Sequence, residues 1–63
     1  MTDFKKRVEG ERDNLFTKVQ ALECFTQSSN FAQLDNAQRD LLLRQLQYMT
    51  SYLEVLDDRI SYF

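Results

Sequence analysis

The stretch that decides the fold is residues 44–56, RQLQYMTSYLEVL. It contains neither proline nor glycine, so nothing in it interrupts a helix. Leu46 and Leu53 are seven residues apart and are interleaved with Met49 and Leu56. This three-four alternation is typical of a helix that packs along a second helix in a coiled-coil seam. Other apolar and aromatic residues lie outside the seam, so a single partner helix does not cover them all.

The same seam continues beyond this stretch in both directions, to Leu42 and to Ile60. Asp35 is followed three residues later by Gln38, which is the pattern of a capping box at the start of a helix. No helix breaker follows before the C-terminus. The sequence therefore predicts a long helix over about 36–62.

A first long helix is predicted over about 3–25, beginning with Thr2 as its capping residue. Its apolar residues at one heptad position are Val8, Leu15 and Leu22. The complementary heptad position is occupied by Phe4, Glu11, Lys18 and Phe25. We therefore expect Glu11 and Lys18 to lie inside the seam. Because an unpaired buried charge is costly, they should pair with each other, with Gln45 or with a bound molecule. Seven residues apart, they cannot pair directly within one helix.

The connection between the helices is predicted over residues 26–35, where TQSSN is a cluster of turn-forming residues. Phe31 and Leu34 suggest one helical turn that folds back over the end of the molecule. Gly10 lies inside the first helix, and marks either a close neighbour or a weak spot. The expected fold is all-α, with residues 1–63 forming one helical hairpin of two long antiparallel helices.

Small size predicts self-association for this hairpin. A chain of 63 residues usually needs disulfides, a metal or oligomerisation to be stable. With one cysteine, Cys24, and no histidine, neither an internal disulfide nor a structural zinc site is plausible. A second apolar stripe on the second helix comprises Leu41, Tyr48, Val55 and Tyr62. We expect it to meet another subunit in a helical-bundle homo-oligomer, a tetramer or alternatively a dimer.

Charge and hydropathy narrow the class of partner. Eight basic and ten acidic side chains give a net charge of -2, which argues against a duplex nucleic-acid binder. Small anionic ligands stay open, because an oligomer can gather its cations in one pocket. The N-terminus is charged from its third residue and no apolar run is long enough to span a membrane. We therefore expect a cytosolic protein with no membrane partner.

Polar residues along one edge of the second helix suggest a ligand site. Gln45, Tyr52 and Arg59 recur at intervals of seven along the second helix. In an antiparallel hairpin, Arg7 should lie across from the C-terminal end of this row. A guanidinium binds anions, an amide can read a base edge, and a phenol ring can stack on a base. The alternative is a polar layer that fixes the helix register, with salt bridges at its rim.

Catalysis has few candidate groups in this sequence. There is no histidine, no cysteine near a base and no glycine-rich phosphate loop. Asp57 and Asp58 are expected to form a solvated face beside Arg59, not a metal site. We therefore expect no enzyme activity, no catalytic or metal-ligating residues and no cofactor.

Four motifs, spread over nearly the whole chain, resemble those of a known protein family. They are F-x-x-R-V-x-x-E from Phe4, L-x-x-K-x-x-x-L-x-x-F from Leu15, F-x-x-L from Phe31, and R-x-L-L-x-x-Q-L-x-x-M-x-x-Y-L-x-V-L-x-x-R-I from Arg39. This order resembles a widespread family of very small phage proteins that is known by a crAss-like phage member. The chain also looks like the tetrameric helical sponges with which phages sequester cyclic nucleotide alarm signals, such as those of CBASS immunity.

The resemblance implies a phage protein in the cytoplasm of the infected bacterial host. It would bind a signal of the cyclic dinucleotide class and withhold it from the host effector without breaking a bond. The implied roles place Arg7, Lys18 and Arg59 on phosphates, Tyr52 and Tyr48 on bases, and Gln45 or Glu11 on base edges. The alternative is a helical module that inhibits or scaffolds a host or phage protein through Tyr48 and Tyr62. An enzyme that cleaves such signals ranks last.

Overall fold

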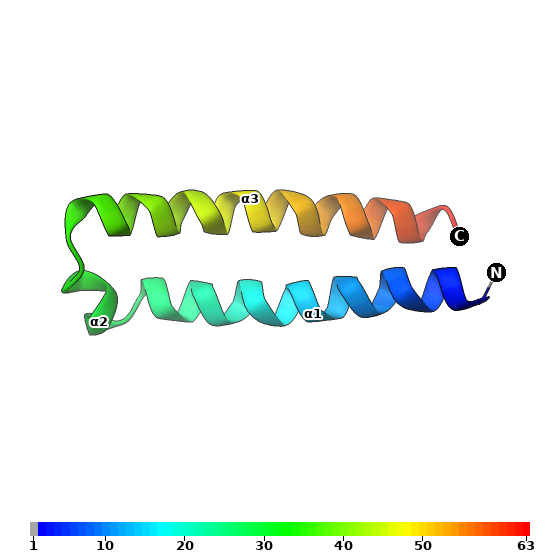
Figure 1. Cartoon of the computed structure of the whole chain (residues 1–63), viewed down its shortest axis with the longest axis horizontal. Coiled ribbons are helices and arrows are strands. Elements are labelled where there is room, and N and C mark those ends of the chain that lie inside the picture. Colours follow the sequence, from blue (N-terminus) through cyan, green and yellow to red (C-terminus); the bar gives the residue numbers. More distant parts are fainter. Residues whose placement is uncertain (1) are drawn as a thin grey trace.

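The computed structural model describes residues 2–63, and side chains from residue 3 onward. Three helices follow one another: α1 (Thr2–Thr26), α2 (Ser29–Ala32) and α3 (Asn36–Ser61). Figure 1 shows α1 and α3 side by side and antiparallel, with the short α2 at the closed end of the hairpin. The molecule is a rod of 47 × 14 × 13 Å. Both long helices lie within a residue of their predicted bounds.

Local hydrogen bonds explain where α2 and α3 begin. The Asp35 side chain accepts a hydrogen bond from the backbone N–H of Gln38 at 2.8 Å, so α3 starts with the predicted cap. The Ser28 hydroxyl accepts from the N–H of Phe31 at 3.2 Å and caps α2 in the same way. The predicted cap of α1 concerns the side chain of Thr2, which lies outside the described side chains.

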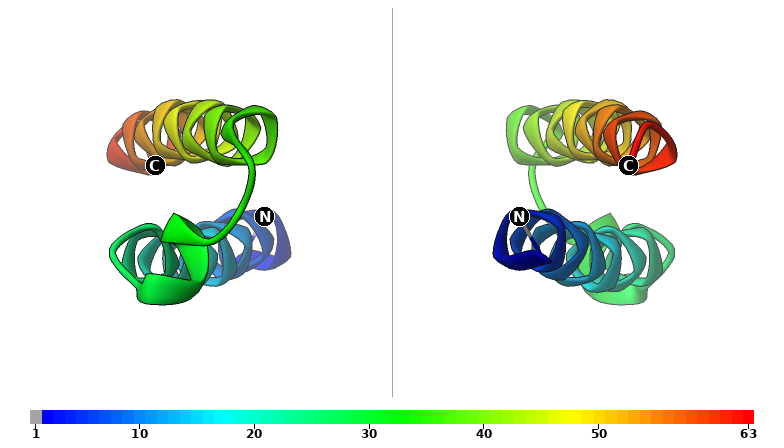
Figure 2. Two further views of the ribbon diagram at one scale, coloured as in Figure 1. Left: turned by 90° about the vertical axis from the view of Figure 1, so that its left-hand side faces the viewer. Right: turned by 90° about the vertical axis from the view of Figure 1, so that its right-hand side faces the viewer.

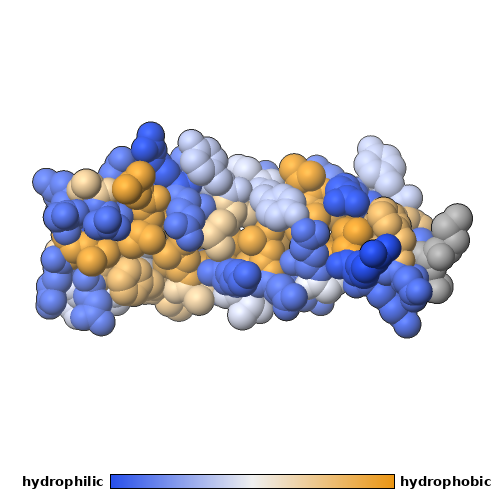
Figure 3. All heavy atoms as spheres, viewed as in Figure 1, coloured by the Kyte–Doolittle hydropathy of each residue, from blue (hydrophilic) through white to orange (hydrophobic). Residues whose placement is uncertain are grey.

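The core is a single narrow seam between α1 and α3. Val8, Val19 and Leu56 are the buried apolar residues, with 5%, 4% and 0% of their surfaces exposed. Half-buried residues of α3 extend the seam, as predicted: Leu42, Leu46, Met49, Leu53 and Ile60. Figure 3 shows apolar residues gathered between the helices and toward the end that carries α2.

The α1 side of the seam differs from the prediction. Val19 is buried, Arg12 is half-buried, and both Glu11 and Lys18 are exposed. The expectation that Glu11 and Lys18 lie inside the seam was therefore wrong. In α1, the second heptad position that faces α3 is one residue later than predicted, at Arg12 and Val19 in place of Glu11 and Lys18. Burying Val19 gains apolar contact while the charges of Glu11 and Lys18 stay in water.

One flank of the seam is held by an ion pair. Arg12 Nε donates to Asp57 Oδ1 at 2.8 Å, and the Arg12 guanidinium lies 4.7 Å from the centroid of the Phe16 ring. The hydrogen bond to Asp57 raises the pKa of Arg12. Asp57 is therefore paired across the hairpin, whereas the sequence placed it on a solvated face beside Arg59.

Aromatic pairs close both ends of the rod. At the closed end, the rings of Phe25 and Phe31 meet edge to face at 6.1 Å, so α2 folds back over the seam as predicted. At the open end, the rings of Phe4 and Phe63 meet at 5.5 Å. Figure 2 shows this open end, where the first and last turns of the long helices face each other.

Gly10 has open space around it. Apart from its chain neighbours and the nearby backbone of α1, a Cβ atom at Gly10 would meet no heavy atom within 4 Å. No neighbour within the hairpin needs the missing side chain, so in the single chain Gly10 is a weak spot of α1.

The narrow seam makes one leucine decisive for stability. Leu56→Ala is expected to lower the free energy of unfolding by about 2–5 kcal/mol, because it leaves a cavity at a fully buried position. Leu43→Ala is the matched control, since Leu43 is 49% exposed on the same helix. Urea unfolding at one fixed protein concentration would measure both, and equal losses would contradict this description of the core.

Candidate functional site

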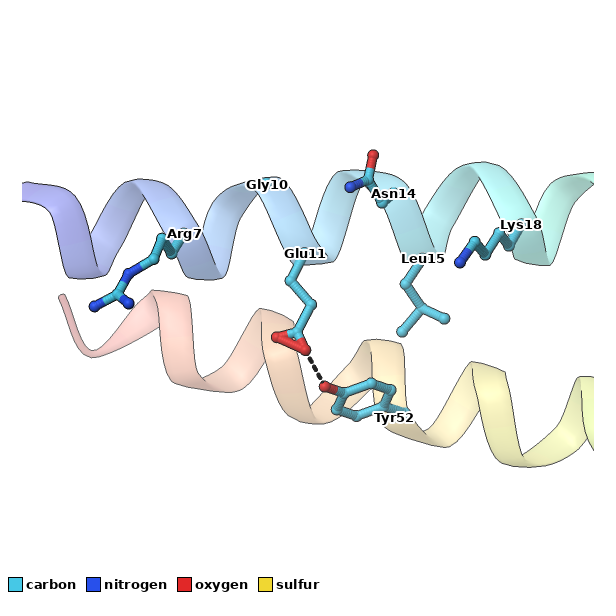
Figure 4. Close-up of a pocket in the computed structure, with 7 residues that line it drawn as sticks. All are labelled: Arg7, Gly10, Glu11, Asn14, Leu15, Lys18 and Tyr52. Carbon is cyan, nitrogen blue, oxygen red and sulfur yellow. Dashed lines mark hydrogen bonds between the residues drawn. The ribbon is translucent and has the colours of Figure 1, made fainter.

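An open hollow lies on the other flank of the seam, between α1 and α3. Its volume is about 560 Å³. The residues that line it are Arg7, Gly10, Glu11, Asn14, Leu15, Lys18 and Tyr52. Figure 4 shows that Tyr52 comes from α3 and all the others from α1. The hollow is therefore built chiefly by one face of one helix.

Helical spacing explains why these α1 residues share a face. Arg7, Glu11, Asn14 and Lys18 follow one another at intervals of four, three and four, which brings side chains to the same side of a helix. The seam residue Leu15 lies beside this row, so the row borders the packed interface with α3. The same shift that buries Val19 leaves Glu11 and Lys18 in the hollow.

Glu11 and Tyr52 connect the two helices across the hollow. The Tyr52 hydroxyl donates a hydrogen bond to Glu11 Oε1 (Figure 4). This hydrogen bond raises the pKa of Tyr52 above its ordinary value of 10.0, with further increases from desolvation and from the Glu11 charge. The positive charge of Arg59 acts in the opposite direction on the same pKa, so Arg59 lies within electrostatic reach of Tyr52.

Two cations in the hollow have no ion-pair partner. Among residues 3–63, Arg7 and Lys18 make no salt bridge and no side-chain hydrogen bond. In Figure 4, Glu11 lies between them along α1 and points toward α3. Unpaired cations on one face, beside an aromatic ring, form a surface suited to an anion that carries flat rings.

The remaining predicted site residues lie elsewhere on the chain. Gln45 and Tyr48 line a second hollow of about 420 Å³ on α3, together with Leu41, Arg44 and Met49. The Gln45 amide contacts the sulfur of Met49 at 3.8 Å. Arg59 lies at the open end, with its guanidinium 5.9 Å from the centroid of the Phe4 ring. One chain thus brings together four of the seven residues: Arg7, Glu11, Lys18 and Tyr52.

Sequence reasoning did not assign three of the lining residues to a site: Gly10, Asn14 and Leu15. Asn14 was detectable, because it is seven residues after Arg7 and four before Lys18 on the same face. Gly10 offers no side-chain chemistry, and only the empty space around it draws attention to it.

The described residues contain neither a cluster of metal ligands nor a membrane-spanning helix. Their cysteine, aspartate and glutamate side chains form no group of three or more that could hold a metal ion. None of their helices is apolar and long enough to cross a membrane.

Comparison with known proteins places the chain among small phage proteins. It is 38% identical over 63 residues to a curated protein of Enterobacteria phage T4, described as an uncharacterized 7.5 kDa protein in the denB-rIIB intergenic region. That alignment covers 100% of this chain and 98% of the T4 protein. No solved structure matches the chain.

Residues 2–62 of the chain also match the model of the Sequestin family. The matched residues take in both long helices and the hollow between them. On a match of this extent, the chain belongs to the Sequestin family.

Proposed function

We propose that this protein sequesters a cyclic nucleotide immune signal, of the cyclic dinucleotide class, in the cytoplasm of a phage-infected bacterium. The observation that carries the proposal is the pair of unpartnered cations, Arg7 and Lys18, beside Tyr52 in one hollow. The family name supports a sequestering role. The resemblance to crAss-like phage proteins and anti-CBASS sponges supplies the ligand class.

Three of the lining side chains have a direct role in this proposal. Arg7 and Lys18 bind the phosphates, since both side chains are donors free to approach an anion. The Tyr52 ring stacks on a base. Binding needs no covalent step, so the ligand is withheld by mass action and leaves the protein unchanged.

A second copy of the chain completes the site. The hollow is open on one side, and Gln45, Tyr48 and Arg59 lie outside it in the single chain. A homo-oligomer, as a tetramer or alternatively a dimer, would bring these residues of one copy toward the hollow of another. Arg59 then contacts a phosphate, Tyr48 a base, and Gln45 a base edge.

The exposed stripe of α3 supports such an assembly. Its members and exposed fractions are Leu41 52%, Tyr48 67%, Val55 52% and Tyr62 90%. These residues recur every seven positions, which is the repeat of a helix that packs along another helix. The seam with α1 already covers a different side of α3, so this stripe is free for a second copy.

Removing a cation from the site should abolish tight binding. Lys18→Ala and Arg59→Ala are each expected to weaken binding of a cyclic dinucleotide roughly ten- to a hundredfold, since a charge-assisted hydrogen bond contributes about 1.5–3 kcal/mol. Lys5→Ala is the control, because it removes the same charge from a residue that lies outside the hollow.

Thermal shift against linear and cyclic di- and trinucleotides would identify the ligand, since a ligand of the native state alone raises Tm. Calorimetry would then give affinities, and light scattering would give the mass of each variant. Binding that survives both substitutions, with the mass unchanged, would contradict the site. Recovery of a cleaved nucleotide after denaturation would contradict the non-catalytic mechanism.

The oligomer has its own test. Tyr48→Asp is expected to reduce the mass measured by light scattering, because a charge in an apolar interface loses its hydration. Leu43→Asp is the matched control, since Leu43 is also exposed but lies outside the stripe. An unchanged mass for Tyr48→Asp would contradict the proposed interface.

The exposed aromatic residues also favour a second candidate function. Tyr48 and Tyr62 are 67% and 90% exposed, as in a helical module that inhibits or scaffolds another protein. Such a module should gain no Tm from any nucleotide. A gain in Tm from one nucleotide, with no second protein present, favours sequestration.

A further inference from the structure

Glu11 is the unexpected member of a site proposed to bind anions. It lies between Arg7 and Lys18 on the same face of α1 (Figure 4), so the hollow contains two positive charges and one negative charge. A carboxylate at this position repels phosphate. The proposed function leaves this repulsion unexplained.

The repelling charge is held in place by Tyr52. Glu11 is four residues after Arg7, close enough for an ion pair within one helix. No such pair is present among residues 3–63, and Glu11 instead accepts the hydrogen bond from Tyr52 across the hairpin. Arg7 and Lys18 therefore stay available to a ligand while the Glu11 charge stays in the hollow.

We propose that Glu11 is a specificity-determining residue that selects ligands by the charge on each phosphate. It admits phosphodiesters, which carry one negative charge per phosphate, and disfavours terminal phosphate monoesters, which carry nearly two. The choice of a nucleotide ligand rests on the proposed function, whereas the charge selection concerns the hollow itself.

Charge matching explains the selection. A cyclic dinucleotide carries two phosphodiester charges, so each of the two cations can pair with one phosphate. Because Glu11 offsets one of the two positive charges, the hollow has no positive charge to spare for a third negative charge on the ligand. A linear dinucleotide with a terminal phosphate carries additional charge near pH 7, because the second pKa of a phosphate monoester is about 6. Glu11 lies four residues from Arg7, about 6 Å along the helix axis. A phosphate bound at Arg7 is therefore within the Debye length of about 8 Å at physiological salt, so the repulsion from Glu11 is only partly screened.

Tyr52 acts as a positioning residue for Glu11. Tyr52→Phe keeps the ring but removes the hydroxyl, which releases Glu11 to pair with Arg7. That pairing should weaken the binding of diesters and monoesters alike, because it neutralises a cation. In the double variant Tyr52→Phe with Glu11→Gln, the cation is free again and the Glu11 charge is gone, so diester binding should recover and match that of Glu11→Gln alone.

The first experiment uses probes that need no knowledge of the natural ligand. Binding of inorganic phosphate and of dimethyl phosphate to the full chain would be followed by NMR chemical shifts. Glu11→Gln is expected to strengthen phosphate binding roughly tenfold and dimethyl phosphate binding only two- to threefold, because the repulsion removed grows with the ligand's charge. Glu9→Gln is the matched control, since Glu9 lines a different hollow on the opposite flank.

The outcomes separate the inference from the proposed function. Equal gains for both probes in Glu11→Gln, or the same gains in Glu9→Gln, would overturn the charge selection. If the two probes respond as expected but no cyclic dinucleotide binds wild-type protein, the selection holds and the proposed ligand is wrong. A variant that fails to fold would be recognised by its NMR spectrum, and Glu11→Ala would then replace it.

Titration of Tyr52 gives an independent readout of the same contact. Because its folded-state pKa is raised above 10.0, the hydrogen bond stabilises the hairpin fully below pH 10.0 and is lost as pH rises through the folded-state pKa. The difference in ultraviolet absorbance between wild type and Tyr52→Phe isolates this phenol. Glu11→Gln is expected to lower its pKa toward 10.0, and an unchanged pKa would contradict the contact.

Discussion

The single seam between two helices is the constraint on which the rest of the molecule depends. Two helices have only one line of contact, so among residues 3–63 only Val8, Val19 and Leu56 leave water almost completely. Polar contacts then tie the helices on each flank, through Arg12 and Asp57 on one side and through Glu11 and Tyr52 on the other. The hollow with the free cations lies on the second flank. In a protein this thin, the candidate site beside the core also contains one of the contacts that join the helices.

Most of the fold could be predicted from local pattern. The Asp35 cap fixes the start of α3, and the repeat of leucines along α3 fixes the face that packs. The error lay in α1, where two frames one residue apart both contain apolar residues. One frame buries Glu11 and Lys18, whereas the other buries Val19. The second frame also contains two charged residues, Lys5 and Arg12, so counting charges does not distinguish the two frames. The structure accommodates Arg12 in the second frame because its guanidinium pairs with Asp57 across the hairpin, a contact that the pattern along α1 does not show.

The candidate site was predictable only where its members share one helix face. Arg7, Glu11 and Lys18 share a face of α1, and the antiparallel pairing brings Tyr52 to them. Gln45 and Arg59 were assigned from their spacing with Tyr52 along α3, and Tyr48 from the role that the resemblance implies. Spacing gives a direction around the helix but not the chain that these residues face. Whether they complete a site therefore depends on assembly, which the pattern within one hairpin does not determine. Gly10 escaped assignment because a missing side chain has no chemistry of its own.

The antiparallel course of the hairpin has a consequence for its local stability. Contacts between α1 and α3 join residues close in sequence at the α2 end and residues 58 positions apart at the other, where Lys5 reaches the carbonyl of Phe63. Closing the longest loop costs the most entropy, so the open end is the first part to fray. Amide protection against hydrogen exchange should then fall from α2 toward the open end. Arg7, Glu11 and Tyr52 lie in the half of the hairpin nearer the open end. A molecule bound between α1 and Tyr52 would therefore hold the two helices together where they separate most easily.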